Sequence, residues 1–193
     1  MVQKGRPAGI VVVQDDNVNA LEIGFSIGSF LIIWMSIEII VLFFVNKKLA
    51  SSPFEEEEKD NIKEESKDYA SRALILAGLT FAAIALWVGA FSSKLEEIEA
   101  TVAVSMFALF FFLFSYKMYG LTDFRRIYWI MQDKSLNFGL IAIVLALVTF
   151  SLEKLPWLSV PALLFSVVMI ILQLAEDKKD LDCYWQRRKG RKK

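Results

Sequence analysis

The chain alternates between long apolar blocks and short charged segments. Five blocks of nearly uninterrupted apolar residues cover positions 21–45, 69–91, 100–120, 136–152 and 156–174. A helix of about 20 predominantly apolar residues crosses the roughly 30 Å hydrocarbon core of a bilayer. The pattern therefore predicts an all-α, polytopic integral membrane protein, a bundle of five transmembrane helices within residues 21–175.

The fourth and fifth blocks are the shortest, and only Glu153, Lys154 and Leu155 separate them. Pro156 can begin a helix, and it disfavours helical backbone at the residue before it. We therefore expect a tight hairpin of two crossing helices. A single long buried segment and a re-entrant pair are the alternatives.

The segment between the first two blocks is strongly charged. Ser52, Pro53 and Glu55 have the spacing of a capping box with proline at the first helical position. With no later glycine or proline before residue 69, the pattern predicts one helix over about 53–91. Its charged part, 53–68, would extend roughly 20 Å into the cytosol. A spacer, a partner-docking arm and a disordered acidic loop are the three interpretations of this part.

Basic residues set the expected orientation, because cytoplasmic loops are enriched in Lys and Arg. Of the 22 basic residues, four (Lys4, Arg6, Lys94 and Lys154) fall on one side and the other eighteen on the opposite side. This predicts an extracytoplasmic N-terminal tail, 1–20, and a basic cytoplasmic tail, 176–193. We expect the cell membrane as the location.

Composition excludes several kinds of chemistry. The chain has no histidine and one cysteine, Cys183, so it has neither an internal disulfide nor the commonest general base. No nucleophile elbow and no phosphate-binding glycine loop occurs. We therefore expect a protein that is not an enzyme and that holds no metal and no cofactor.

Small residues recur at helical spacing in every block, which is typical of helices that pack closely in a membrane. The candidate helix-packing residues are Gly24, Gly28, Gly78, Ala82, Ala85 and Gly89. Comparable positions in the later blocks include Ser105, Ala108, Gly139, Ala142, Ala146, Ala162 and Ser166. Five such stripes indicate a packed bundle rather than independent anchors.

Glu38 is the most unusual residue inside a predicted span, where a carboxylate costs a few kcal/mol. One hypothesis makes it an ion or proton site, or a contact to a partner's basic residue. The other makes it a structural group bonded to Lys117, Ser105 or Tyr116. Lys117 and Gln173 are further intramembrane polar candidates.

Basic residues next to predicted spans are expected to bind anionic lipid headgroups. They are Arg125 and Arg126 in an interfacial segment, 121–135, with a short helix capped by Thr122 or Asp123. The others are Arg187, Arg188, Lys189, Arg191, Lys192 and Lys193 in the tail. With no folded module around these residues, nucleic acid is not an expected partner.

Two function classes remain. The first is a non-catalytic structural, assembly or sensing subunit that binds other membrane-protein subunits, or itself, through its small-residue faces. The alternative is a subunit of an ion or proton channel or transporter that uses Glu38. Neither an inverted repeat nor a helix interrupted in mid-span, the features typical of transporters, is visible.

Overall fold

The structure is a computed structural model that describes residues 20–45, 56–122 and 125–190, without the side chains of 56–58, 176–177 and 180–190. Five of its helices are long and apolar enough to cross a membrane, and the described part of the chain contains no strand. The expected all-helical architecture with five candidate spans is therefore confirmed. Five such helices suggest an integral multi-pass membrane protein.

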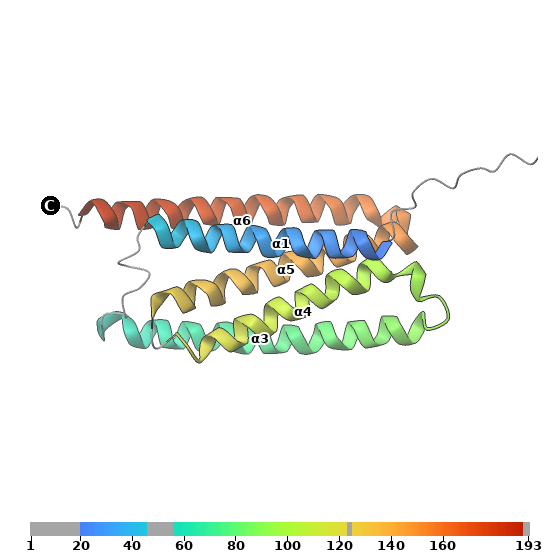
Figure 1. Cartoon of the computed structure of the whole chain (residues 1–193), viewed down its shortest axis with the longest axis horizontal. Coiled ribbons are helices and arrows are strands. Elements are labelled where there is room, and N and C mark those ends of the chain that lie inside the picture. The colour runs from blue at the N-terminus through green and yellow to red at the C-terminus, as the bar shows by residue number, and fades with distance from the viewer. Residues whose placement is uncertain (1–19, 46–55, 123–124, 191–193) are drawn as a thin grey trace, which may run out of the picture.

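The helices lie side by side along one long axis (Figure 1). Their bounds are α1 Ala20–Val45, α3 Glu56–Ala90, α4 Glu99–Tyr119, α5 Arg126–Lys154 and α6 Pro156–Gly190, with a short 3₁₀ helix η1, Leu95–Glu97. In Figure 1, α6 and α1 lie along one edge, α3 along the opposite edge, and α4 and α5 run obliquely between them.

The core is formed mainly by α4 and α5. Their most apolar windows are 50% and 56% buried, whereas those of α1, α3 and α6 are 22% buried or less. Phe111, Phe112 and Phe138 are fully buried at the centre of this core. The outer three helices therefore present most of their apolar surface outward, as expected for helices that face lipid rather than water.

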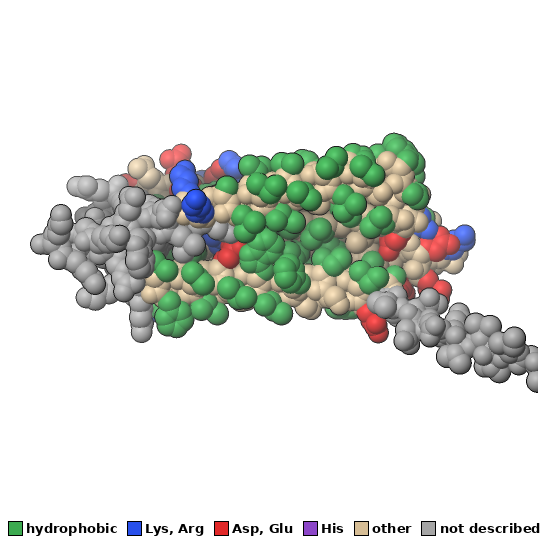
Figure 2. Space-filling view, turned by 90° about the horizontal axis from the view of Figure 1, so that it is seen from above, with side chains coloured by type: hydrophobic (Ala, Val, Ile, Leu, Met, Phe, Trp, Pro, Cys, Tyr) green, Lys and Arg blue, Asp and Glu red, His purple; other side chains and the backbone are tan. Residues whose placement is uncertain are grey.

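Figure 2 shows one face of the molecule, on which apolar side chains cover the middle and charged side chains gather toward both ends. We call the end with the α3–α4 loop and the α5–α6 turn the Glu97 end. The opposite end, where α4 finishes and α5 begins, is the Gln132 end. An apolar belt between two charged ends is the distribution that a bilayer requires.

The α5–α6 turn has the predicted form of a tight hairpin. Leu155 has a non-helical backbone, with φ −134° and ψ 68°, and α6 begins at Pro156. The candidate spans on either side, Arg126–Lys154 and Pro156–Ala175, contain 29 and 20 residues. Each is long enough to cross about 30 Å, so the pair consists of two candidate crossing helices rather than a short re-entrant loop.

The Gln132 end differs from the sequence-based expectation. Residues 126–135 are the first turns of α5 and not a separate interfacial helix. The residue that caps α5 is Arg125, in an extended conformation, while the Thr122 hydroxyl donates to the carbonyl of Tyr119 in the preceding turn. Asp123 and the predicted capping box at Ser52 to Glu55 lie outside the described residues.

The charged first part of α3 is continuous with its apolar part, in one helix from Glu56 to Ala90. It does not stand alone, because Ser66 is fully buried and bonded to Gln132 of α5. Gln132 is available because α5 begins at Arg126, before the predicted span that starts at residue 136. The polar ends of α3 and α5 are therefore packed against each other at the Gln132 end.

Candidate functional site

The glycine pair of α1 packs inside the bundle, against α4. A Cβ placed on Gly24 would lie 2.7 Å from the Cβ of Ala103, and one on Gly28 would overlap the ring of Phe107. Both glycines are buried. At Gly24 a Cβ would also lie 3.0 Å from the Ala100 carbonyl oxygen, so glycine allows the two backbones to approach closely there, and at Gly28 it leaves room for the Phe107 ring. This stripe therefore holds two helices of the same chain together.

The predicted stripe of α3 lies on an uncovered face. Gly78, Ala82, Ala85 and Gly89 are all exposed, and a Cβ on either glycine would meet no heavy atom within 4 Å. At 100° per residue the four positions fall within an arc of about 60° on one helix face. Large exposed side chains, among them Leu79, Phe81 and Leu86, flank that face.

A second set of small residues on α3 turns toward the bundle instead. Ser66, Ala70, Ala73, Ala77 and Thr80 are all buried, and they also follow helical spacing. This face packs against the core around Phe111 and Phe112. The small residues of the later helices behave in the same way: Ser105, Ala108, Gly139, Ala142, Ala146 and Ser166 are buried. The sequence analysis singled out the stripe of Gly78, Ala82, Ala85 and Gly89 and did not identify this second set on α3, which is the one that packs within the chain.

Glu38 lies on the side of α1 that faces α5. The ring of Trp34, one turn earlier, packs edge-on against Phe138 of α5 with their centroids 5.4 Å apart. The two helices α1 and α5 run in opposite directions. Glu38 is one turn after Trp34 on α1, and Lys134 is one turn before Phe138 on α5, so both lie one turn closer to the Gln132 end and at a similar level. Both carboxylate oxygens of Glu38 are buried, and Lys134 is 1% exposed.

The other polar candidates for contact with Glu38 lie elsewhere. The Ser105 hydroxyl donates to the carbonyl of Thr101 in its own helix, and Tyr116 and Lys117 are exposed. Within the described residues, neither Tyr116 nor Lys117 is hydrogen-bonded to Glu38. Gln173, on α6, is buried at 5% exposure.

A buried polar layer joins three helices at the Gln132 end. The Ser66 hydroxyl donates to Gln132 Oε1 at 2.5 Å, and Gln132 Nε2 donates to the Ser66 carbonyl at 2.8 Å. The Ser115 hydroxyl of α4 donates to the Gln132 carbonyl at 2.8 Å, and the Ser135 hydroxyl to the Phe111 carbonyl at 2.6 Å. The layer gives α3, α4 and α5 a fixed register, because each of these buried groups has a partner.

The basic residues predicted to meet lipid headgroups divide into three groups. Arg125 is exposed, as a headgroup contact requires. Arg126 is only 7% exposed, which differs from the expectation, because the first turn of α5 packs against the bundle instead of lying on its surface. The basic tail residues Arg187, Arg188, Lys189, Arg191, Lys192 and Lys193 have side chains outside the described part.

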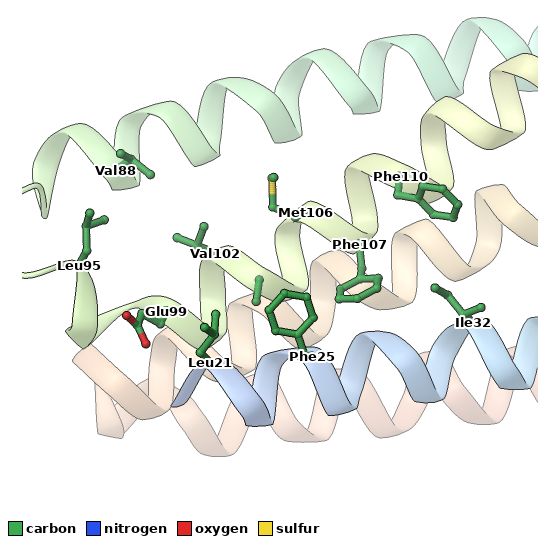
Figure 3. A pocket seen from close by; sticks show the side chains of 11 residues that line it. Leu21, Phe25, Ile32, Val88, Leu95, Glu99, Val102, Met106, Phe107 and Phe110 are labelled. Atoms are coloured by element: carbon green, nitrogen blue, oxygen red, sulfur yellow. The ribbon is translucent and has the colours of Figure 1, made fainter. Parts of the chain in front are cut away.

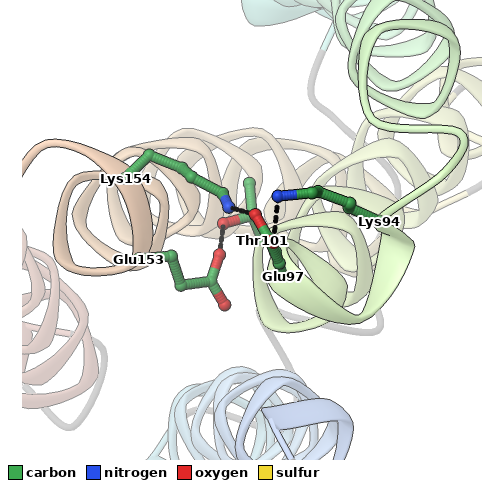
Figure 4. A network of polar contacts seen from close by, with 5 residues as sticks. All are labelled: Lys94, Glu97, Thr101, Glu153 and Lys154. Atoms are coloured by element: carbon green, nitrogen blue, oxygen red, sulfur yellow. Dashed lines mark hydrogen bonds and ion pairs between the residues drawn. The ribbon is translucent and has the colours of Figure 1, made fainter.

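An ion-pair cluster ties the loops together at the Glu97 end (Figure 4). Glu97 pairs with Lys94 at 3.1 Å and also with Lys154, whose ammonium lies 5.1 Å from the centroid of the Phe91 ring. Hydrogen bonds from Lys154 and Lys94 lower the pKa of the Glu97 carboxyl. Beside this cluster, the Thr101 hydroxyl donates to Glu153 at 2.7 Å, joining α4 to α5.

An apolar groove of about 660 Å³ opens at the same end, between α1 and α3 (Figure 3). Its wall on α1 includes Leu21, Phe25 and Ile32, and α4 forms its floor. Among the described residues that line it, Glu99, which is half-buried, is the one charged residue. The volume lies within the range of about 300–1,000 Å³ typical of small-ligand pockets.

Sequence reasoning singled out Glu38 but missed Lys134 and Gln132. Both follow the charged loop, in a segment interpreted as interfacial, so neither stood out as a polar residue within an apolar block. The spacing of Gln132 and Lys134 from Ser135 matches no sequence motif that would mark a buried polar site.

Among the described residues, no group of three His, Cys, Asp or Glu side chains could hold a metal ion. No protein-family model, no curated protein and no solved structure matches this chain.

Proposed function

We propose that this chain is a non-catalytic, multi-pass subunit of a membrane-protein assembly, which binds a transmembrane helix of another subunit or of a second copy. The observation that supports this proposal is the uncovered small-residue face of α3. Because lipid tails are as apolar as side chains, helix association in a membrane depends on close packing over small residues. The other predicted stripes are largely buried within the chain, which leaves this one available.

A photo-activatable side chain beside this face tests the proposal. We expect one at Leu79 or Phe81, which flank the face, to form a protein adduct in native membranes. The adduct should disappear when Ala82 and Ala85 are both changed to Leu, because two larger side chains would hold the partner helix away. The same probe at Leu164, equally exposed on α6, is the control. Adducts that survive the double change, or form equally at Leu164, would count against the proposal.

The proposed orientation puts the Glu97 end outside the cell membrane and the Gln132 end in the cytoplasm, where Arg125 and the basic tail meet anionic headgroups. The unequal distribution of Lys and Arg supports it. A cysteine at Ser92 or Leu155 should then react with an impermeant thiol reagent in intact cells. Reaction only after lysis would invert the orientation.

An ion or proton channel or transporter is the second candidate, and the buried carboxylate of Glu38 favours it. A buried lysine at the same level, Lys134, instead favours a structural role, since a basic side chain beside the carboxylate is typical of a fixed pair rather than of a path for cations. Flux through reconstituted liposomes distinguishes the two. Flux that is present in the unmodified protein and lost in Glu38→Gln would support transport. Absence of flux would support the subunit role.

A further inference from the structure

The groove between α1 and α3 has the length of one bilayer leaflet. Its wall on α1 extends from Leu21 to Ile32, which is about 16 Å at 1.5 Å per residue. Half of the hydrocarbon core measures about 15 Å. A hydrocarbon chain from the leaflet at the Glu97 end would therefore fill the groove from its mouth to the middle of the bilayer.

The walls suit a flexible apolar chain rather than a second helix. Phe25 and Phe107 meet edge-on with their centroids 5.9 Å apart, and Met106 and Phe110 are 56% and 50% exposed along the floor. Large side chains therefore line the depression, without the small-residue surface that close helix approach requires. Methionine and aromatic side chains adapt their shape to irregular apolar ligands.

Charge at the mouth of the groove indicates the kind of headgroup. Lys94 and Lys154 are both paired with Glu97. Within the described residues, no cation pairs with Glu99, the carboxylate at the mouth (Figure 3). Glu22 and Glu96 at the same end are also exposed. A positively charged group would complement this mouth, whereas a purely anionic headgroup would be repelled.

We infer that this groove is a binding site for one hydrocarbon chain of a membrane lipid, and that Glu99 selects a lipid whose headgroup carries an ammonium. The inference rests on insertion of the chain in a bilayer and not on assembly through α3. Among the described residues that line the groove, Val88 alone belongs to α3, and it is not one of the four small residues of the assembly face, Gly78, Ala82, Ala85 and Gly89.

The test uses the full chain in vesicles of equal parts phosphatidylethanolamine and phosphatidylglycerol, with a photo-activatable residue at Met106. We expect ethanolamine lipid adducts to exceed glycerol lipid adducts by about threefold, a preference of the size given by a partly exposed ion pair. Glu99→Gln should abolish the preference, since the amide keeps the shape and loses the charge. Glu96→Gln, on the same loop but outside the groove, is the matched control and should retain it.

A second variant tests whether the groove is occupied. Val102→Trp fills its outer half, so adducts of either lipid at Phe110, deeper in the groove, should fall, while Leu164→Trp on α6 should leave them unchanged. Equal adducts of the two lipids at Met106 would overturn the assigned selectivity, as would a preference that persists in Glu99→Gln. Adducts to protein rather than lipid, whether to another chain or to this chain's own N-terminal segment, would overturn the assigned occupant. A failed assembly test at α3 would leave each of these outcomes measurable.

Discussion

Glu97 shows how a single exposed carboxylate organises the end of the bundle. It pairs with Lys94 in its own loop and with Lys154 at the end of α5, so one side chain joins the α3–α4 loop to the α5–α6 turn.

At the glycines, it is the absence of a side chain that determines the packing. Gly28 is needed because Phe107 occupies the space of its Cβ, whereas Gly78 has open space around it.

The lowered pKa of Glu97 predicts acid sensitivity at this end. The folded carboxyl titrates below its ordinary value of 4.5, so its contribution is present above that pH and is lost as pH falls through the lower, folded value. We expect the midpoint of thermal unfolding in detergent to fall modestly between pH 5.5 and pH 3.5. Glu97→Gln should lower it at pH 5.5 and make this fall smaller. An equal fall in both proteins would contradict the assigned role.

At the scale of the helices, hydrophobic pattern was sufficient to predict five candidate spans, because each exceeds the length of a bilayer core. The pattern did not predict that the polar first turns of α5, at Gln132 and Lys134, are buried. A sequence pattern does not show that neighbouring helices pack against a polar or charged turn. The small-residue pattern also did not reveal the face of α3 that packs inward. Which face does so depends on the shape of α4 and α5, and in particular on the large rings of Phe111 and Phe112.

The buried layer at the Gln132 end predicts a coupled loss of stability. Gln132→Leu removes the acceptor 2.5 Å from the buried Ser66 hydroxyl and leaves it only the longer contact to the Thr122 hydroxyl at 3.3 Å, at a cost of about 1–3 kcal/mol in the free energy of unfolding. Adding Ser66→Ala should recover part of that loss, because both ends of the bond are then apolar. Ser71→Ala, at an exposed position of α3, serves as the control for denaturant unfolding. Purely additive losses would show that the pair does not act as a unit.

At the scale of the whole molecule, the described helices pack around the α4–α5 core and leave two surfaces without a partner of their own. One is the small-residue face of α3, and the other is the groove between α1 and α3 at the Glu97 end. These two surfaces on a bundle of five apolar helices are the basis of the proposed role as an assembly subunit, which would act through contacts with neighbours in the membrane.

The most direct test compares two variants by their particle mass in mild detergent and by their unfolding temperature. Gly78→Leu with Ala82→Leu should reduce the mass to that of a smaller assembly while the unfolding temperature of the chain stays unchanged, because neither position packs against its own bundle. Gly28→Leu should instead lower the unfolding temperature, since overpacking against Phe107 costs about 1–3 kcal/mol. An unchanged particle mass in the Gly78→Leu, Ala82→Leu variant would contradict the proposal that α3 joins this chain to its partner.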